Sequence, residues 1–111
     1  MAAALAIVTE ARPGDARTRL RRGEALYKLR RMRDSMAEVR TVLALTPAPD
    51  PLDLADAHFG AAMIEASEGD EARALEDLRL TLQLNPAHPR AEWIRSRLAA
   101  AAAAANGRGG R

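Results

Sequence analysis

The stretch LTLQLNP at residues 80–86 has a close counterpart in TVLALTP at residues 41–47. Both stretches contain the pattern Leu-x-Leu-x-Pro, as Leu43, Leu45 and Pro47 in one and as Leu82, Leu84 and Pro86 in the other. Proline has no amide hydrogen and cannot continue the hydrogen-bond ladder of a helix, so each stretch marks the end of a helix. An apolar helix that ends in nearly the same residues twice within 111 residues indicates an internal repeat.

The composition favours helices along the whole chain. Alanine, leucine, arginine and glutamate are strong helix formers, and aromatic residues make up only 3% of the sequence, which disfavours strands. The chain has no cysteine, which excludes disulfides, thiolate catalysis and cysteine-based metal sites. No apolar run reaches the length of a membrane span. We therefore expect an all-α protein that does not cross a membrane, with the cytoplasm as its default location.

Prolines and glycines divide the chain into segments whose apolar residues recur every three or four positions, as on one face of a helix. Asp50 followed by Pro51 places a capping residue and a first-turn proline in their preferred positions. Asp15, Asp34 and Asp70 are expected to open further helices. The segments predict six helices, over about residues 1–11, 16–30, 34–46, 51–68, 70–84 and 89–105.

The spacing of the prolines suggests the size of the repeat. Pro13 and Pro47 are 34 residues apart, and Pro47 and Pro86 are 39 residues apart, with the extra residues in the loop 48–52, where an insertion costs little. An offset of 39 also aligns small residues that would let two helices of one unit cross closely. The aligned pairs are Gly23 with Ala62, Ser35 with Ala74, Val39 with Leu78, Leu43 with Leu82, and Leu45 with Leu84.

A period of about 34 residues with a helix–turn–helix unit resembles the tetratricopeptide repeat (TPR) family. The second unit, residues 55–88, is the better match, because EGDEARALEDLRLTLQLNP combines a Gly-Asp turn with the expected apolar positions and the final proline. It departs from the family at His58, where tryptophan is frequent, and at Ala61, where leucine is usual.

The first unit, residues 16–49, lacks the turn glycine of the family. Arg30 stands where Gly69 stands in the second unit, and Arg31 stands where Asp70 stands. We expect this turn to be strained or to have a different shape.

The resemblance implies a single domain over residues 1–105, built as a short right-handed α-solenoid of antiparallel helix–turn–helix repeats. Its expected parts are a half-repeat over 1–13, repeats over 16–49 and 55–88, a capping helix over 89–105 and a disordered tail over 106–111. Trp93, Ile94 and Leu98 are expected to pack on the last unit. An unrelated helical bundle is the alternative.

The expected first helix is apolar nearly all round, which predicts that something covers it. Either the chain is cut from a longer array or this helix is an interface for self-association.

The resemblance also implies a concave groove, lined by the first helix of each unit, that holds a peptide or partner segment. Leu20 and Glu24 occupy the places where some members carry the lysine and asparagine of a carboxylate clamp, so that clamp is not expected. Cations beside apolar groups favour a ligand with acidic and apolar residues. The groove positions carried over are Arg17, Leu20, Arg21, Glu24, Tyr27, Lys28, Asp56, Phe59, Gly60, Met63 and Ser67.

Charge is unevenly distributed along the chain. Residues 17–33 carry eight cations and one acid, whereas residues 50–77 carry nine acids and one cation, Arg73. The basic run is either a solvated face or a surface for an acidic peptide, an anionic lipid surface or nucleic acid. Nucleic acid is the weaker interpretation, because the run has only Tyr27 as a stacking aromatic. Opposite charges on neighbouring chains are a further route to a homo-oligomer.

Catalytic and metal motifs are not found in the sequence. His58 and His88 have no partner at metal-ligand spacing and are interpreted as structural or surface residues. The serines lack a nucleophile motif, and no glycine-rich phosphate loop occurs. We therefore expect a protein-interaction module or adaptor that is not an enzyme and uses no cofactor or metal.

Overall fold

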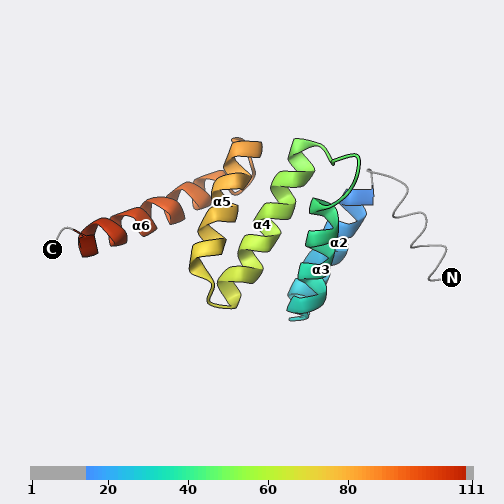
Figure 1. The fold of residues 1–111 in the computed structure, drawn as a ribbon, viewed down its shortest axis with the longest axis horizontal. Coiled ribbons are helices and arrows are strands. Elements are labelled where there is room, and N and C mark those ends of the chain that lie inside the picture. The colour runs from blue at the N-terminus through green and yellow to red at the C-terminus, as the bar shows by residue number, and fades with distance from the viewer. Residues whose placement is uncertain (1–14, 110–111) are drawn as a thin grey trace.

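The computed structural model describes residues 15–109, and this part of the chain is all-helical (Figure 1). It contains no strand between residues 15 and 109, which confirms the all-α expectation. The helix expected over residues 1–11 lies outside the described residues. The described helices are α2 (Asp15–Lys28), α3 (Met32–Leu43), α4 (Pro51–Ser67), α5 (Glu71–Leu84) and α6 (Ala91–Gly109).

The helices follow one another along the molecule as two hairpins and a projecting helix (Figure 1). Helices α2 and α3 form the first hairpin, and α4 and α5 form the second. Helix α4 packs on α5 on one side and on both helices of the first hairpin on the other, and α6 contacts α5. Because α2 and α4 are both first helices of a hairpin, their contact brings equivalent faces of the two units together.

Small residues lie where the two helices of each hairpin cross. Gly23 and Ser35 are buried in the first hairpin, and the Ser35 hydroxyl donates a 2.7 Å hydrogen bond to the Gly23 carbonyl oxygen. In the second hairpin the aligned residues Ala62 and Ala74 are buried as well. The prediction that small side chains meet at the crossing is therefore confirmed in the first hairpin. In the second hairpin the two alanines lie in one buried cluster.

The two hairpins turn with the same backbone geometry. The Arg30 amide donates to the Tyr27 carbonyl and the Arg31 amide to the Leu26 carbonyl, both at 2.9 Å. The same two bonds recur 39 residues later, at 3.1 and 2.9 Å. This is the Schellman arrangement, which needs a left-handed residue: φ is +83° at Gly69 and +65° at Arg30. The first turn is therefore strained but keeps its shape, because the non-glycine residue accepts the left-handed conformation.

Two of the expected caps open helices as predicted. The Asp50 side chain accepts a 2.9 Å hydrogen bond from the Asp53 amide, and Pro51 is the first residue of α4. The Asp70 side chain accepts a 3.3 Å bond from the Arg73 amide at the start of α5.

The prediction that Asp34 opens α3 is wrong. The left-handed Arg30 ends the first turn so tightly that α3 already begins at Met32, after Arg31, which makes no side-chain capping bond. Asp34 lies in the first helical turn instead, where its charge suits the helix dipole and pairs with Arg31 at 2.6 Å. Helix α3 also ends at Leu43, three residues earlier than expected.

The buried apolar side chains form two neighbouring clusters. The first joins α2 and α3 to α4, with Val39, Val42 and Ile64 as its largest buried members. The second joins α4, α5 and α6 through Leu78 and Ile94. Since α4 contributes to both clusters, it connects the buried cores of the two hairpins.

Helix α6 packs only through its first turns. Ile94 is fully buried and Leu98 packs against the second cluster, as expected. Trp93 meets Phe59 of α4 edge-on and keeps 38% of its surface exposed. The helix continues to Gly109, four residues beyond its expected end, since the alanine run favours continuation through Asn106. No helix within residues 15–109 combines the length and hydropathy needed to cross a membrane.

Candidate functional site

A cavity of about 510 Å³ opens between α2, α4 and the loop that leads to α6. We call it the groove. Ten of the eleven positions expected from the TPR resemblance line it, and Ser67 does not. The ten are Arg17, Leu20, Arg21, Glu24, Tyr27, Lys28, Asp56, Phe59, Gly60 and Met63, and the groove is completed by Gly23, Ser35, Val39, His88 and Arg90.

Helical spacing explains why these residues share one surface. On α2 they recur at intervals of three and four from Arg17 to Lys28, and on α4 they recur in the same way from Asp56 to Met63. Gly60 lets α4 approach α3 closely, since a Cβ atom there would lie 3.4 Å from a methyl group of Val39. Most of the groove wall is thus built from α2 and α4, and residues of α3 and of the loop before α6 complete it.

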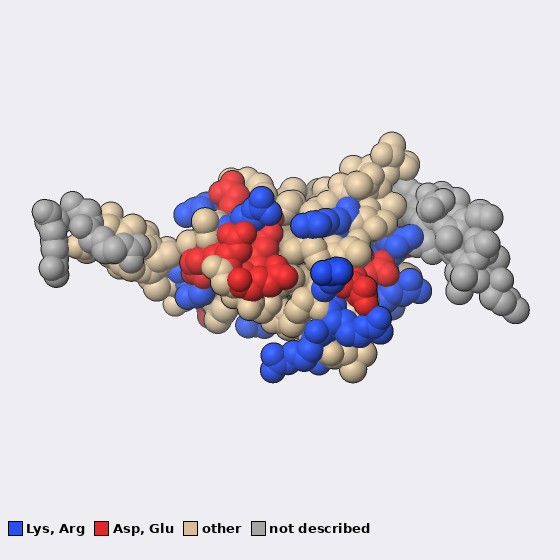
Figure 2. Space-filling view, turned by 60° about the horizontal axis from the view of Figure 1, so that its bottom comes forward, with Lys and Arg blue, Asp and Glu red and all other residues tan. Residues whose placement is uncertain are grey.

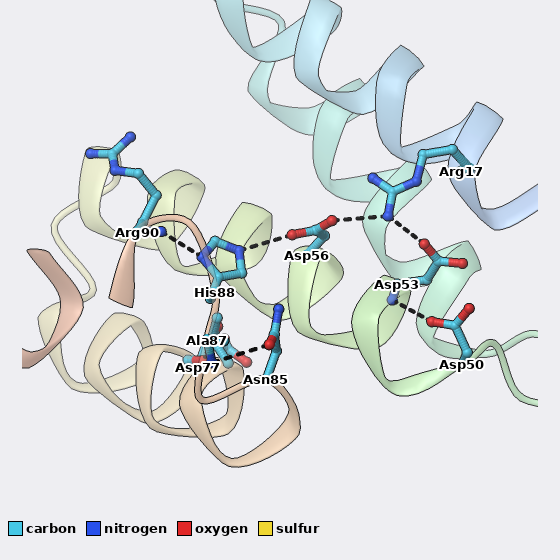
Figure 3. A network of polar contacts seen from close by, with 10 residues as sticks. Arg17, Asp50, Asp53, Asp56, Asp77, Asn85, Ala87, His88 and Arg90 are labelled. Carbon is cyan, nitrogen blue, oxygen red and sulfur yellow. Dashed lines mark hydrogen bonds and ion pairs between the residues drawn. The ribbon is translucent and has the colours of Figure 1, made fainter. Parts of the chain in front are cut away.

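A polar network closes one end of the groove (Figure 3). Arg17 of α2 pairs with Asp53 and with Asp56 of α4, the latter at 3.0 Å. Burial alone would lower the pKa of Arg17, but its hydrogen bonds with Asp56 and Asp53 raise that pKa overall. Arg17 is therefore held as a structural link between the hairpins, and is less available to a ligand than its sequence position suggests.

His88 extends this network into the loop before α6. The ring is buried, its Nε2 atom lies 2.8 Å from an Asp56 carboxylate oxygen, and its Nδ1 atom accepts a 3.0 Å bond from the Arg90 amide (Figure 3). Since Nδ1 is an acceptor, Nε2 carries the proton and donates to Asp56. His88 has a structural role, as predicted, but it lies in the groove wall, which the sequence did not indicate.

Aromatic side chains and Arg90 form the groove wall next to this network. The Arg90 guanidinium lies 5.6 Å from the centre of the Phe59 ring and 5.2 Å from that of Trp93. Phe59 meets Trp93 edge-on at 6.2 Å and lies 5.1 Å from the His88 ring. Arg90 is therefore stacked and makes no ion pair within residues 15–109, which leaves its charge available at the rim.

The basic run of residues 17–33 divides into two groups. Arg17, Arg19, Arg22 and Arg31 each pair with a carboxylate. The other four cations make no ion pair within residues 15–109, and they are Arg21, Lys28, Arg30 and Arg33. Figure 2 shows basic side chains over the first hairpin and an acidic group over the second. The unpaired cations, rather than the whole run, are available to a ligand.

The second hairpin contains a compact acidic cluster outside the groove. His58 Nδ1 lies 2.7 Å from Asp77, at the positions that Arg19 and Glu38 occupy in the first hairpin. Burial raises the pKa of Glu65 to about 8, with further contributions from a hydrogen bond to Asp77 and from the charge of Asp77. Within residues 15–109, no three potential ligands gather in a way that could hold a metal ion.

Comparison of the chain with models of protein families, with curated proteins and with solved structures gave no match. The groove is therefore interpreted from its own residues. Ten of its positions were expected from the TPR resemblance, and the helical spacing on α2 and α4 explains why they share one surface. His88 and Arg90 lie on a loop, and their place in the wall depends on how that loop folds back on α4.

Proposed function

We propose that this chain is a non-enzymatic interaction module of the TPR type, with its hairpins stacked as a short right-handed α-solenoid. In this proposal a peptide or partner segment binds in the groove between α2 and α4. The observation that carries it is that ten positions expected from the resemblance line one cavity of about 510 Å³. Cavities of roughly 300–1,000 Å³ are the usual size for small ligands and short peptide segments.

The lining chemistry indicates the kind of peptide. Phe59, Met63 and Tyr27 offer apolar and aromatic contacts, and methionine adapts readily to different side chains. Arg21 and Lys28 lie on the α2 side without ion-pair partners among the described residues, so an acidic group could pair with them without displacing a carboxylate of the protein. The expected ligand is a segment with at least one acidic and one apolar residue.

The test uses the full chain and a synthetic library of short random peptides. Peptides that bind are resynthesised and titrated by fluorescence anisotropy against the wild type and the double variant Arg21→Glu/Lys28→Glu. We expect acidic and apolar residues to be enriched, and affinity to fall at least about tenfold in the variant, equivalent to ~1.4 kcal/mol. Arg17 is left unchanged because its reversal would break the network with Asp53 and Asp56.

A matched variant controls for net charge. Arg33 and Arg40 are exposed cations of α3 that lie outside the groove and make no ion pair within residues 15–109. Arg33→Glu/Arg40→Glu changes the net charge equally and is expected to bind within about twofold of the wild type. An equal loss of peptide affinity in both variants would show that the effect comes from the net charge of the chain and not from contacts in the groove. A mass that doubles with concentration in light scattering would favour the alternative, a chain that associates with itself.

A further inference from the structure

A second, smaller cavity of about 280 Å³ lies at the turn between α2 and α3. We call it the turn pocket. Its lining residues are Tyr27, Lys28, Arg30, Met32 and Ser67. Tyr27 and Lys28 also line the groove, so a ligand in the groove would reach the turn pocket along α2. The residue that falls outside the groove, Ser67, belongs to this second cavity.

The turn pocket has the composition of an anion site. It is lined by two cations, a tyrosine, a methionine and Ser67, with no carboxylate among them. The Ser67 hydroxyl already donates a 2.6 Å hydrogen bond to the Ile64 carbonyl oxygen, so the cations are the groups that favour an anion. Lys28 and Arg30 make no ion pair within residues 15–109, whereas the neighbouring Arg31 is neutralised by Asp34 at 2.6 Å. Two unneutralised cations at one cavity attract a negatively charged group.

The backbone of Arg30 supplies an independent observation. Its φ of +65° is in the left-handed region that favours glycine, and the equivalent residue of the second hairpin is a glycine with φ of +83°. The first hairpin therefore keeps a long cationic side chain at a position where glycine would be relaxed. Backbone strain of this kind tends to occur at binding sites, where the side chain is needed.

We propose that the turn pocket binds the phosphoryl group of a phosphorylated peptide whose neighbouring residues occupy the groove. A phosphomonoester carries close to two negative charges at neutral pH, which matches Lys28 and Arg30. The guanidinium of Arg30 can donate two parallel hydrogen bonds to phosphate oxygens, and Lys28 adds a point charge. The Tyr27 hydroxyl is a further donor. The peptide part of this inference rests on the proposed function of the groove.

The first experiment tests the turn pocket without a peptide. Inorganic phosphate is titrated into the ¹⁵N-labelled full chain, with sodium chloride at matched ionic strength as reference. We expect phosphate-specific shifts of the Lys28, Arg30 and Ser67 amides, and an affinity at least about fivefold weaker in Arg30→Gly and in Lys28→Gln. Arg33→Gln, an unpaired cation outside the turn pocket, is expected to bind within about twofold of the wild type.

Arg30→Gly is suited to this test because glycine is relaxed at a positive φ, so a loss of binding cannot be attributed to unfolding. Thermal melting checks this, and Lys28→Gln provides a second variant at an unstrained position. Phosphate shifts absent from the turn pocket, or unchanged affinity in both variants, would overturn the proposal.

The second experiment separates this proposal from that for the groove. Groove-binding peptides are compared as matched pairs with and without one phosphoserine. Phosphorylation is expected to raise affinity at least about tenfold in the wild type, and Arg30→Gly is expected to abolish that gain while leaving the unphosphorylated peptide unaffected. If peptides bind but phosphorylation does not raise their affinity, the turn-pocket proposal is overturned and the groove proposal is kept. If the chain binds inorganic phosphate but binds no peptide, the groove proposal is overturned instead.

Discussion

The two hairpins pack their helices together at equivalent positions but with different residues. Where their helices cross, the first hairpin uses Gly23 with a hydrogen bond of 2.7 Å from Ser35, and the second uses two buried alanines, Ala62 and Ala74. The helix pair in each is also linked by one polar contact at equivalent positions, 3.0 Å for Arg19–Glu38 and 2.7 Å for His58–Asp77. Between the two units, residue size and the position of contacts are therefore retained more strictly than residue identity.

The hairpins differ most in side-chain charge and in backbone strain at two pairs of equivalent positions. The first carries Leu26 and a strained Arg30, and the second carries Glu65 and a relaxed Gly69 at the same positions. Burial of Glu65 beside Asp77 gives the second hairpin a pH-dependent element at the position where the first hairpin has Leu26. Each of these differences can be exchanged or removed experimentally.

The largest effect on stability is expected from Gly23→Leu, which disrupts the close contact between α2 and α3 in the first hairpin. A Cβ atom at Gly23 would lie 3.6 Å from the Cβ of Glu38 and 3.7 Å from the Ser35 carbonyl oxygen, so a methyl group fits and a longer side chain does not. Overpacking costs about 1–3 kcal/mol, and loss of the Ser35 hydrogen bond adds roughly 1 kcal/mol.

Gly23→Ala is the matched variant, and it is expected to stabilise the chain by about 0.5–1 kcal/mol because glycine is unfavourable inside a helix. Thermal and urea unfolding measure both changes. If the leucine variant melted like the wild type, Gly23 would not lie at a close helix crossing.

The next effect is a pH dependence confined to the second hairpin. The pKa of Glu65 is raised from 4.5 to about 8, so between these values the folded state holds a proton that the unfolded chain has lost. The free energy of unfolding contributed by this group is therefore fully present at low pH and is lost as pH rises toward 8. Glu65→Gln is expected to stabilise the chain by about 1 kcal/mol at pH 8.5 and to have little effect at pH 4.5.

Urea unfolding of the wild type and of Glu65→Gln across this range measures the difference between the two stability curves. Glu68→Gln, which removes an exposed acid three residues along the same segment, controls for net charge and is expected to give a nearly constant difference. A constant offset for Glu65→Gln as well would show that Glu65 titrates as an ordinary surface carboxyl group.

Much of the fold could be predicted because its signals are local. Asp50 and Pro51 mark the start of α4. The TPR resemblance named ten of the positions that the helical spacing on α2 and α4 brings to one groove. The features that could not be predicted depend on the path of the turns and loops. The alignment of Arg30 with Gly69 predicts a turn that is strained or differently shaped, but it does not predict that Arg30 keeps the geometry of the glycine. His88 reaches Asp56 only because the loop before α6 folds back.

The two turn residues should give effects of opposite sign on stability, each no larger than that expected for Glu65→Gln. Gly69→Ala is expected to destabilise the chain by about 1 kcal/mol, and since no atom lies within 4 Å of the added Cβ, the cost is that of the positive φ alone. Arg30→Gly removes the same cost from the first turn, less the extra entropy of glycine in the unfolded chain, and should stabilise by about 0.5 kcal/mol. For a domain of this size these changes shift the melting temperature by roughly 4–8 °C per kcal/mol. Opposite shifts would show that the two turns share one geometry, whereas destabilisation by both variants would mean that the Arg30 side chain stabilises its turn by more than the strain it carries.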